Sequence, residues 1–135
     1  MSDKIKMAHE LHAKGFNCAQ SVAMPFCEEL GADLITVAKS MEGFGGGMGG
    51  YSLVCGALSG AICVAGLSLA DGNLENPASK RTTYSVADTL CKRFTAECGS
   101  HLCPEIKGLG GGPMLKSCKD CIETGVRLAQ EVIGK

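Results

Sequence analysis

The longest uncharged stretch of the chain, residues 43–70, is the feature that most limits its fold. Its first part is a glycine-rich loop, and its second part contains mainly Gly, Ala, Ser, Cys and large aliphatic residues. A helix without a polar face is buried among other helices or lies in a membrane. This stretch has neither a cluster of Lys or Arg at its ends nor the aromatic belt typical of membrane helices. We therefore predict a helix buried at the centre of a small bundle, and no membrane insertion.

The rest of the chain shows helical periodicity with clear start and stop signals. Asn17 and Gln20 form a capping-box pair before a helix that ends at Gly31, with a bend expected at Pro25. Further helices are predicted over residues 2–14, 33–41, 52–70, 76–98 and 117–133, and a short turn follows Cys103. A chain of this length can bury a full core as one domain. The expected fold is all-α, a single domain over residues 1–135 with about five or six helices.

Composition narrows the choice of partners and compartment. The chain has 13 Lys and Arg against 14 Asp and Glu, so no basic field is present to attract nucleic acid. Its first fifteen residues are polar and amphipathic, without the apolar segment of a secretory signal. Nine cysteines make an odd number, which favours reduced thiols in a cytoplasmic protein over a framework of disulfides.

The cysteines divide into two groups when they are placed on the predicted helices. Those at predicted helix starts are Cys18, Cys55, Cys103 and Cys118. Those inside predicted helices, and expected in the core, are Cys27, Cys63, Cys91 and Cys98. A helix N-terminus carries a partial positive charge that favours thiolate over thiol. The first group therefore contains the candidates for chemistry.

Four thiolates that converge repel one another unless a cation lies between them, so an iron-sulfur cluster is the first expectation and zinc the alternative. Glycine amides could then donate to the cluster sulfurs, and the candidate cofactor-binding residues are Gly45, Gly46, Gly47, Gly49 and Gly56. Without a metal, the same four cysteines could form redox disulfides. The glycine loop also matches GxGxxG, but no predicted strand precedes it, so no nucleotide is expected.

Two further residues near these cysteines have open roles. Cys121 forms a CxxC pair with Cys118, but Ile122 stands where a haem-attachment motif has histidine, so no haem is expected. His101 lies two residues before Cys103 and is the histidine closest to the predicted site in sequence. Either residue could join the site.

Several blocks of this chain resemble the C-GCAxxG-C-C family, small proteins described as redox-active. The blocks are GFNCAQSV at residues 15–22, the glycine loop with CGALSG at residues 55–60, GSHLC at residues 99–103, and Cys118 with its amphipathic helix. The resemblance covers most of the chain and implies four shared cysteines, which are the same four chosen above. The chain departs from the family pattern at Tyr51-Ser52-Leu53 and at Cys121.

Three functions remain open from the sequence. The leading hypothesis is a small electron-transfer protein with an iron-sulfur cluster on the four cysteines. The second is metal-free thiol-disulfide chemistry, and the third is a structural zinc site or an interaction module without catalysis. We expect a redox carrier or accessory protein more than a stand-alone enzyme. A redox partner protein is expected, and formation of a homo-oligomer is left open.

Overall fold

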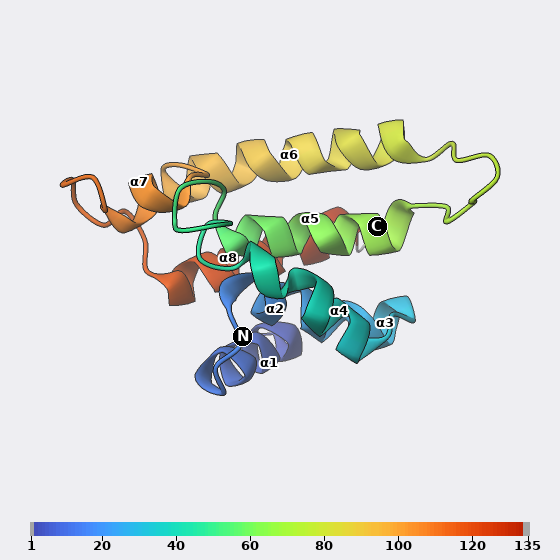
Figure 1. Cartoon of the computed structure of the whole chain (residues 1–135), viewed down its shortest axis with the longest axis horizontal. Coiled ribbons are helices and arrows are strands. Elements are labelled where there is room, and N and C mark those ends of the chain that lie inside the picture. The colour runs from blue at the N-terminus through green and yellow to red at the C-terminus, as the bar shows by residue number, and fades with distance from the viewer. Residues whose placement is uncertain (1, 134–135) are drawn as a thin grey trace.

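The computed structural model describes residues 2–133, which form an all-α fold (Figure 1). The helices are α1 (Asp3–Ala13), α2 (Cys18–Ala23), α3 (Cys27–Leu30), α4 (Leu34–Met41), α5 (Gly56–Leu69), α6 (Lys80–Cys98), α7 (Cys103–Lys107) and α8 (Cys118–Ile133). Two 3-10 turns, Met24–Phe26 and Glu42–Phe44, follow α2 and α4. No strand occurs within the described residues, although one isolated β-bridge joins Val54 and Leu102. The predicted fold class is therefore confirmed.

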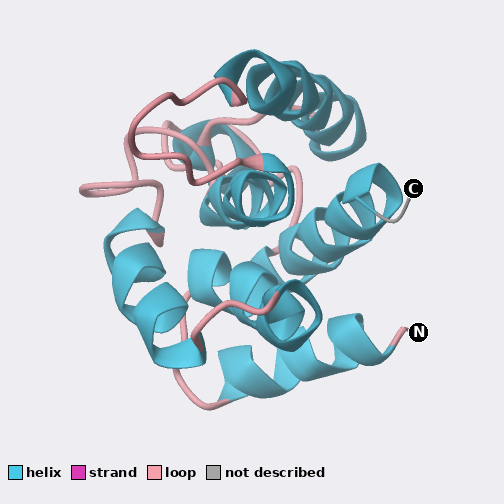
Figure 2. Ribbon diagram, turned by 90° about the vertical axis from the view of Figure 1, so that its right-hand side faces the viewer, coloured by secondary structure: helices cyan, strands magenta, loops and turns pink. Residues whose placement is uncertain are grey.

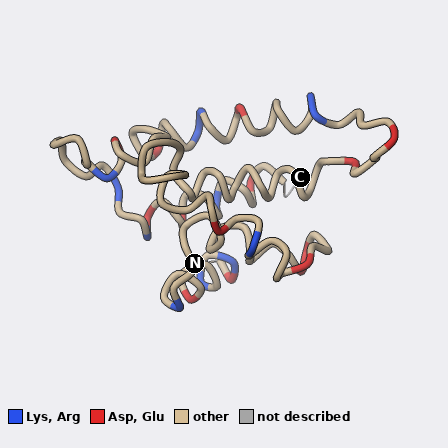
Figure 3. Tube along the Cα trace, in the orientation of Figure 1, with Lys and Arg blue, Asp and Glu red and all other residues tan. Residues whose placement is uncertain are grey.

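The uncharged helix α5 lies between α2, α6 and α8, with α6 along one side and α1 and α4 beyond α2 (Figures 1 and 2). Its buried residues are Gly56, Ala57, Leu58, Gly60, Ala61, Val64 and Ala65. Leu67, near its C-terminal end, remains exposed. Charged residues are spread over the outer helices and loops (Figure 3), so the uncharged sequence of α5 matches its position in the bundle.

Glycines let α2, α5 and α8 approach backbone to backbone. A Cβ atom at Gly60 would lie 2.6 Å from the Ala19 carbonyl oxygen in α2. A Cβ atom at Gly125 of α8 would lie 2.8 Å from the Ala57 carbonyl oxygen in α5. Real Cβ atoms do not approach other atoms so closely. The absence of side chains at these two positions therefore sets the spacing of the three helices that carry the core.

Most predicted helix ends agree with the structure, but two starts differ. Cys55 is itself the N-cap of α5, and not the third residue of a helix capped by Ser52. The segment before α5 is instead held in the Val54–Leu102 bridge, which keeps it extended. Cys103 is the first residue of α7, whose N-cap is Leu102. These shifts are one or a few residues, so the cysteines remain at helix starts.

The start of α6 lies at Lys80, four residues after the predicted cap Asn76. The Asp71 carboxylate accepts hydrogen bonds from the N–H groups of Asn73 and Ala78, at 3.0 and 2.9 Å. The Asn73 side chain in turn accepts from the N–H groups of Glu75 and Asn76. These side chains satisfy the backbone of the loop, so Asn76-Pro77 does not begin the helix.

No helix within residues 2–133 combines the length and apolar character that spanning a membrane requires. The longest helix, α6, is polar along most of its exposed surface. The uncharged helix α5 has 14 residues, fewer than the roughly 20 that cross a bilayer.

Candidate functional site

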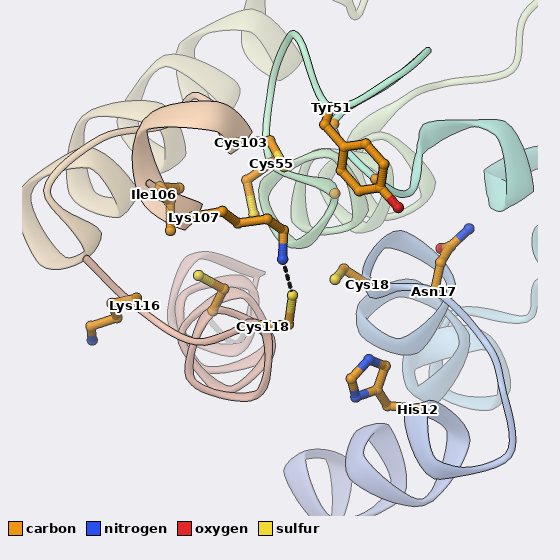
Figure 4. Close-up of a pocket in the computed structure, with 14 residues that line it drawn as sticks. His12, Asn17, Cys18, Tyr51, Cys55, Cys103, Ile106, Lys107, Lys116 and Cys118 are labelled. Carbon is orange, nitrogen blue, oxygen red and sulfur yellow. Dashed lines mark hydrogen bonds between the residues drawn. The ribbon is translucent and has the colours of Figure 1, made fainter. Parts of the chain in front are cut away.

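A cavity of about 200 Å³ opens where the N-terminal ends of α2, α5, α7 and α8 meet (Figure 4). Its lining residues include all four cysteines predicted for the site, Cys18, Cys55, Cys103 and Cys118, together with Cys121. Each of the four belongs to the start of a different helix. The structure therefore brings together residues that are up to 100 positions apart in the chain.

Cys18 is positioned by a complete capping box at the start of α2. The Asn17 side chain accepts a hydrogen bond from the Gln20 N–H at 2.9 Å, and the Gln20 side chain accepts one from the Asn17 N–H at 3.0 Å. The Asn17 amide also donates to the Glu42 carbonyl at 2.8 Å, and that of Gln20 to the Ala38 carbonyl at 2.7 Å. The capping pair predicted from the sequence thus also ties α2 to α4 and its following turn.

Cys55 and Cys103 are held side by side by backbone hydrogen bonds around the isolated β-bridge. The Cys55 N–H donates to the His101 carbonyl at 2.9 Å, and the Cys103 N–H donates to the Leu53 carbonyl at 2.7 Å. Both side chains are buried. The short bridge therefore fixes the positions of Cys55 and Cys103, as the capping box fixes the position of Cys18.

Three of the five predicted cofactor-binding glycines line the cavity, namely Gly46, Gly47 and Gly56. A Cβ atom at Gly47 would lie 2.6 Å from the Cys103 Cβ, and Gly47 has a φ of 68° that disfavours other residues. Gly45 packs against Asn17 outside the lining, and Gly49 faces open space. The loop therefore serves first to let the backbone approach Cys103 closely.

Cys118 has the most strongly activated sulfur in the cavity. A hydrogen bond from the Cys18 thiol, followed by a hydrogen bond and positive charge from Lys107, lowers the pKa of Cys118 from its ordinary 9.0 to about 5. The Lys107 ammonium donates directly to the Cys118 sulfur, and Figure 4 shows this amine pointing into the space between the cysteines. The same pairing raises the pKa of Cys18, which keeps its proton. Cys118 is therefore a thiolate at neutral pH, with a protonated thiol beside it.

A second group of sulfurs lies deeper. A hydrogen bond from Cys121, together with the backbone N–H groups of Ala57 and Leu58, lowers the pKa of Cys55 to about 7. Cys121 also donates toward Cys98, and both contacts raise its own pKa. Burial raises the pKa of the Cys103 thiol. In this group, the sulfur at the start of α5 is the one most readily ionised.

Exposure separates the two groups. Cys18 and Cys118 are partly exposed, whereas Cys55, Cys103 and Cys121 are buried, with no more than 6 % of their surface open to solvent. All nine cysteines are free thiols. A reactant that enters the cavity therefore meets the Cys18–Cys118 pair first.

The sequence interpretation missed one central residue and left two others open. Lys107 follows Cys103 by four positions in α7, and residues at that spacing share one helix face, which is the signal that could have found it. Cys121 lines the cavity, whereas His101 is exposed, lies outside the lining and shares a hydrogen bond with Thr95. Of the two residues with open roles, only Cys121 therefore joins the site.

The cysteines of the cavity do not form a compact set of metal ligands. Within residues 2–133, no group of three or more His, Cys, Asp or Glu side chains is arranged to hold a metal ion. The four predicted ligand cysteines each come from the start of a different helix and line one cavity. The Lys107 ammonium supplies positive charge next to the Cys118 sulfur.

The fold and site define a class: an all-α protein whose helix starts surround a cysteine-lined pocket. The chain belongs to the family described as "Putative redox-active protein (C_GCAxxG_C_C)", which matches residues 16–132. No curated protein and no solved structure matches the chain. The four cysteines that the family resemblance implies as site residues all line the cavity.

Proposed function

We propose that the protein performs thiol-disulfide chemistry with Cys118 as the attacking thiolate and Cys18 as its resolving partner. One observation carries this proposal: the Lys107 ammonium donates to the Cys118 sulfur, and Cys18 lines the same cavity as this sulfur. A thiolate is the nucleophile in disulfide exchange, and a lowered pKa keeps it available at neutral pH. A neighbouring protonated thiol is what the second step requires.

The exchange balances in two steps. The Cys118 thiolate attacks one sulfur of a substrate disulfide, so that a mixed disulfide forms and the other substrate sulfur leaves as a thiolate. Cys18 passes its proton to that leaving thiolate and then attacks the Cys118 sulfur. When Cys18 attacks, the second substrate sulfur leaves as a thiolate. The products are a Cys18–Cys118 disulfide, one substrate thiol and one substrate thiolate, which then takes a proton from water. The substrate therefore gains two electrons and the protein loses two. A reducing partner would return the pair to its dithiol state.

The proposal is tested by treating the fully reduced protein with a small disulfide in the absence of oxygen. Thiols should disappear in pairs, and peptide mapping should find the Cys18–Cys118 bond. In Cys18→Ser the reaction should stop at a mixed disulfide on Cys118, because no resolving thiol remains. Cys91→Ser is the matched control, since Cys91 is a partly exposed cysteine outside the cavity. It should behave as the unchanged protein does.

Two kinds of result would contradict this proposal. If the substrate disulfide leaves Cys118 unmodified, or if Cys91 and Cys63 react in its place, the cavity is not the reactive site. If the first bond found joins other cysteines and survives in Cys18→Ser, the assignment of the resolving thiol is wrong.

A second candidate is the iron-sulfur cluster predicted from the sequence. It is supported by the four cysteines around one cavity and by Gly46 and Gly47, which line the cavity without side chains that would block a cluster. Cys18, Cys55, Cys103 and Cys118 would hold the cluster, which would supply one-electron transfer. Iron and sulfide analysis after anaerobic reconstitution tests this candidate. Iron bound equally by Cys55→Ser would contradict it.

A further inference from the structure

All side chains of the cavity lining that can carry a full charge at neutral or mildly acidic pH, apart from the cysteines and Tyr51, are basic. Three side chains that can carry positive charge line it, His12, Lys107 and Lys116, and no Asp or Glu is among the lining residues that the structure describes. The whole chain, by contrast, has slightly more acidic than basic residues. The bias is therefore local to the site and is not a consequence of composition.

The three basic groups come from different elements, and two of them, Lys107 and His12, lie near the reactive sulfur. Lys107 reaches Cys118 from α7, and His12 approaches from α1 (Figure 4). Lys116 precedes α8, and its amine points away from the cysteines in Figure 4, toward the rim. Its side chain nevertheless belongs to the cavity lining. Lys and Arg positions also mark the α7–α8 connection in Figure 3.

The remaining polar groups of the lining favour the same type of ligand. Gly46 and Gly47 line the cavity without side chains, so a ligand can approach their backbone closely. The Asn17 amide and the Tyr51 hydroxyl stand on the same side of the cavity (Figure 4). Tyr51 itself has a φ of 63°, a strained backbone for a residue of this size, and strain of this kind is concentrated at functional sites.

The volume of the cavity sets the size of the reactant. Pockets for drug-sized ligands measure about 300 to 1,000 Å³, so a cavity of about 200 Å³ takes a smaller molecule. Cys118 lies within this lining and is only partly exposed, so a folded protein domain could not bring a rigid disulfide to it as easily as a small molecule could.

We infer that the substrate of the Cys18–Cys118 pair is a small disulfide that carries negative charge, such as one with carboxylate groups. This inference rests on the proposed function, because it names the substrate class of the same pair. In the exchange, the anionic disulfide receives two electrons and leaves as two anionic thiols. Lys107, Lys116 and His12 orient its charged groups, while Cys118 attacks its sulfur.

Three aliphatic disulfides of similar size test the inference: dithiodipropionate, hydroxyethyl disulfide and cystamine, which are anionic, neutral and cationic. Each rate with the protein is divided by the rate of the same disulfide with a free small thiol, which removes differences in intrinsic reactivity. The normalised rate should be about tenfold higher for the anion than for the neutral compound and lowest for the cation, as expected for a unit charge near a basic group. Added salt should reduce the difference.

Lys→Gln variants inside and outside the cavity lining show whether the preference for an anion depends on the basic groups of the cavity. Lys116→Gln should lower the ratio of anion to cation rates severalfold. Lys107→Gln should lower both the ratio and the absolute rates, because Lys107 also activates the thiolate. Lys80→Gln makes the same change in net charge at the exposed start of α6, outside the cavity lining, and should leave the ratio unchanged.

The outcomes separate the two proposals. Equal normalised rates for the three disulfides, or a preference for cystamine, would overturn the inference and leave the thiol-disulfide function standing. A ratio that falls as much in Lys80→Gln as in Lys116→Gln would overturn it too. If none of the three compounds modifies Cys118, the proposed function fails, and the substrate inference fails with it.

Discussion

At the scale of single residues, the contact between Lys107 and Cys118 joins two helices that are separated by a loop. Cys118 is the first residue of α8, where the helix dipole already favours an anion. Lys107 is the last residue of α7 and reaches the same sulfur. The hydrogen bond from the Cys18 thiol and the hydrogen bond and charge of Lys107 lower the pKa of Cys118 below that of Cys55.

This arrangement predicts the pH dependence of alkylation at Cys118. The thiolate is the reactive form, and its pKa is lowered, so the rate with neutral iodoacetamide should rise through about pH 5 and be level at neutral pH. Cys18→Ala removes the largest cause of the lowered pKa and should move the midpoint to higher pH. Cys18→Ser restores a donor and should recover part of the shift. Mass spectrometry of the labelled Cys118 peptide measures each rate.

Lys107→Gln should also raise the midpoint, because it removes the second cause, and Lys80→Gln should not. A midpoint near 9 in the unchanged protein, the ordinary value for cysteine, would show that the three contacts do not stabilise the thiolate. The same conclusion would follow if Cys18→Ala and Cys18→Ser had identical profiles.

At the scale of elements, the pocket depends on how closely α2, α5 and α8 pack. Cys18, Cys55 and Cys118 occupy the starts of these three helices, so their distances follow from the helix spacing. That spacing depends on Gly60 and Gly125, where a Cβ atom would collide with a backbone carbonyl. The glycines of the core and the chemistry of the pocket are thus linked by geometry.

Gly125→Ala should lower the free energy of unfolding by about 1 to 3 kcal/mol, the usual range for overpacking a tight core. Its Cβ would lie 2.8 Å from the Ala57 carbonyl oxygen, which belongs to helix backbone and cannot move alone. Gly66→Ala in α5 is the matched control, because nothing lies within 4 Å of its Cβ position. It should raise stability by up to about 1 kcal/mol through helix propensity. Urea unfolding followed by circular dichroism measures both.

Gly125→Ala and Gly66→Ala should also differ in the reactivity of Cys118. Gly125→Ala should slow alkylation of Cys118 at neutral pH, since displaced helices weaken the contact with Cys18, whereas Gly66→Ala should leave it unchanged. Equal stabilities for the two variants would show that α5 and α8 have room between them, contrary to the observed spacing.

At the scale of the whole molecule, a Cys18–Cys118 disulfide would close almost the entire chain into one loop. The two residues are 100 positions apart, and a loop of this length is expected to stabilise the folded state by about 4 to 5 kcal/mol through the unfolded-state entropy. The oxidised protein should therefore unfold at clearly higher urea concentration than the reduced protein. Cys18→Ser should remove the difference. An oxidised form that is less stable than the reduced form would show that the bond strains the helix starts.

Local signals were sufficient for much of this fold. The Asn17–Gln20 capping pair, the Asp33 cap and the Gly31 stop involve residues within a few positions of one another, so the sequence predicts them directly. The start of α6 was predicted wrongly because Asp71, seven residues before Ala78, binds that loop through its side chain. The extended segment before Cys55 depends on a bridge to Leu102, almost 50 residues away, and no local pattern reports such a partner.

By itself, the sequence determined the helical class, the position of four cysteines at helix starts and the uncharged character of α5, because each depends on neighbouring residues or on composition. Only the tertiary structure decided which side chains lie together at the site. Lys107 donates to the Cys118 sulfur, and Cys18, Cys55, Cys118 and Cys121 line one cavity. These contacts are made across separate helices, and helix packing fixes them through backbone contact at positions such as Gly60 and Gly125. The pattern of residues along the chain does not predict those distances between helices.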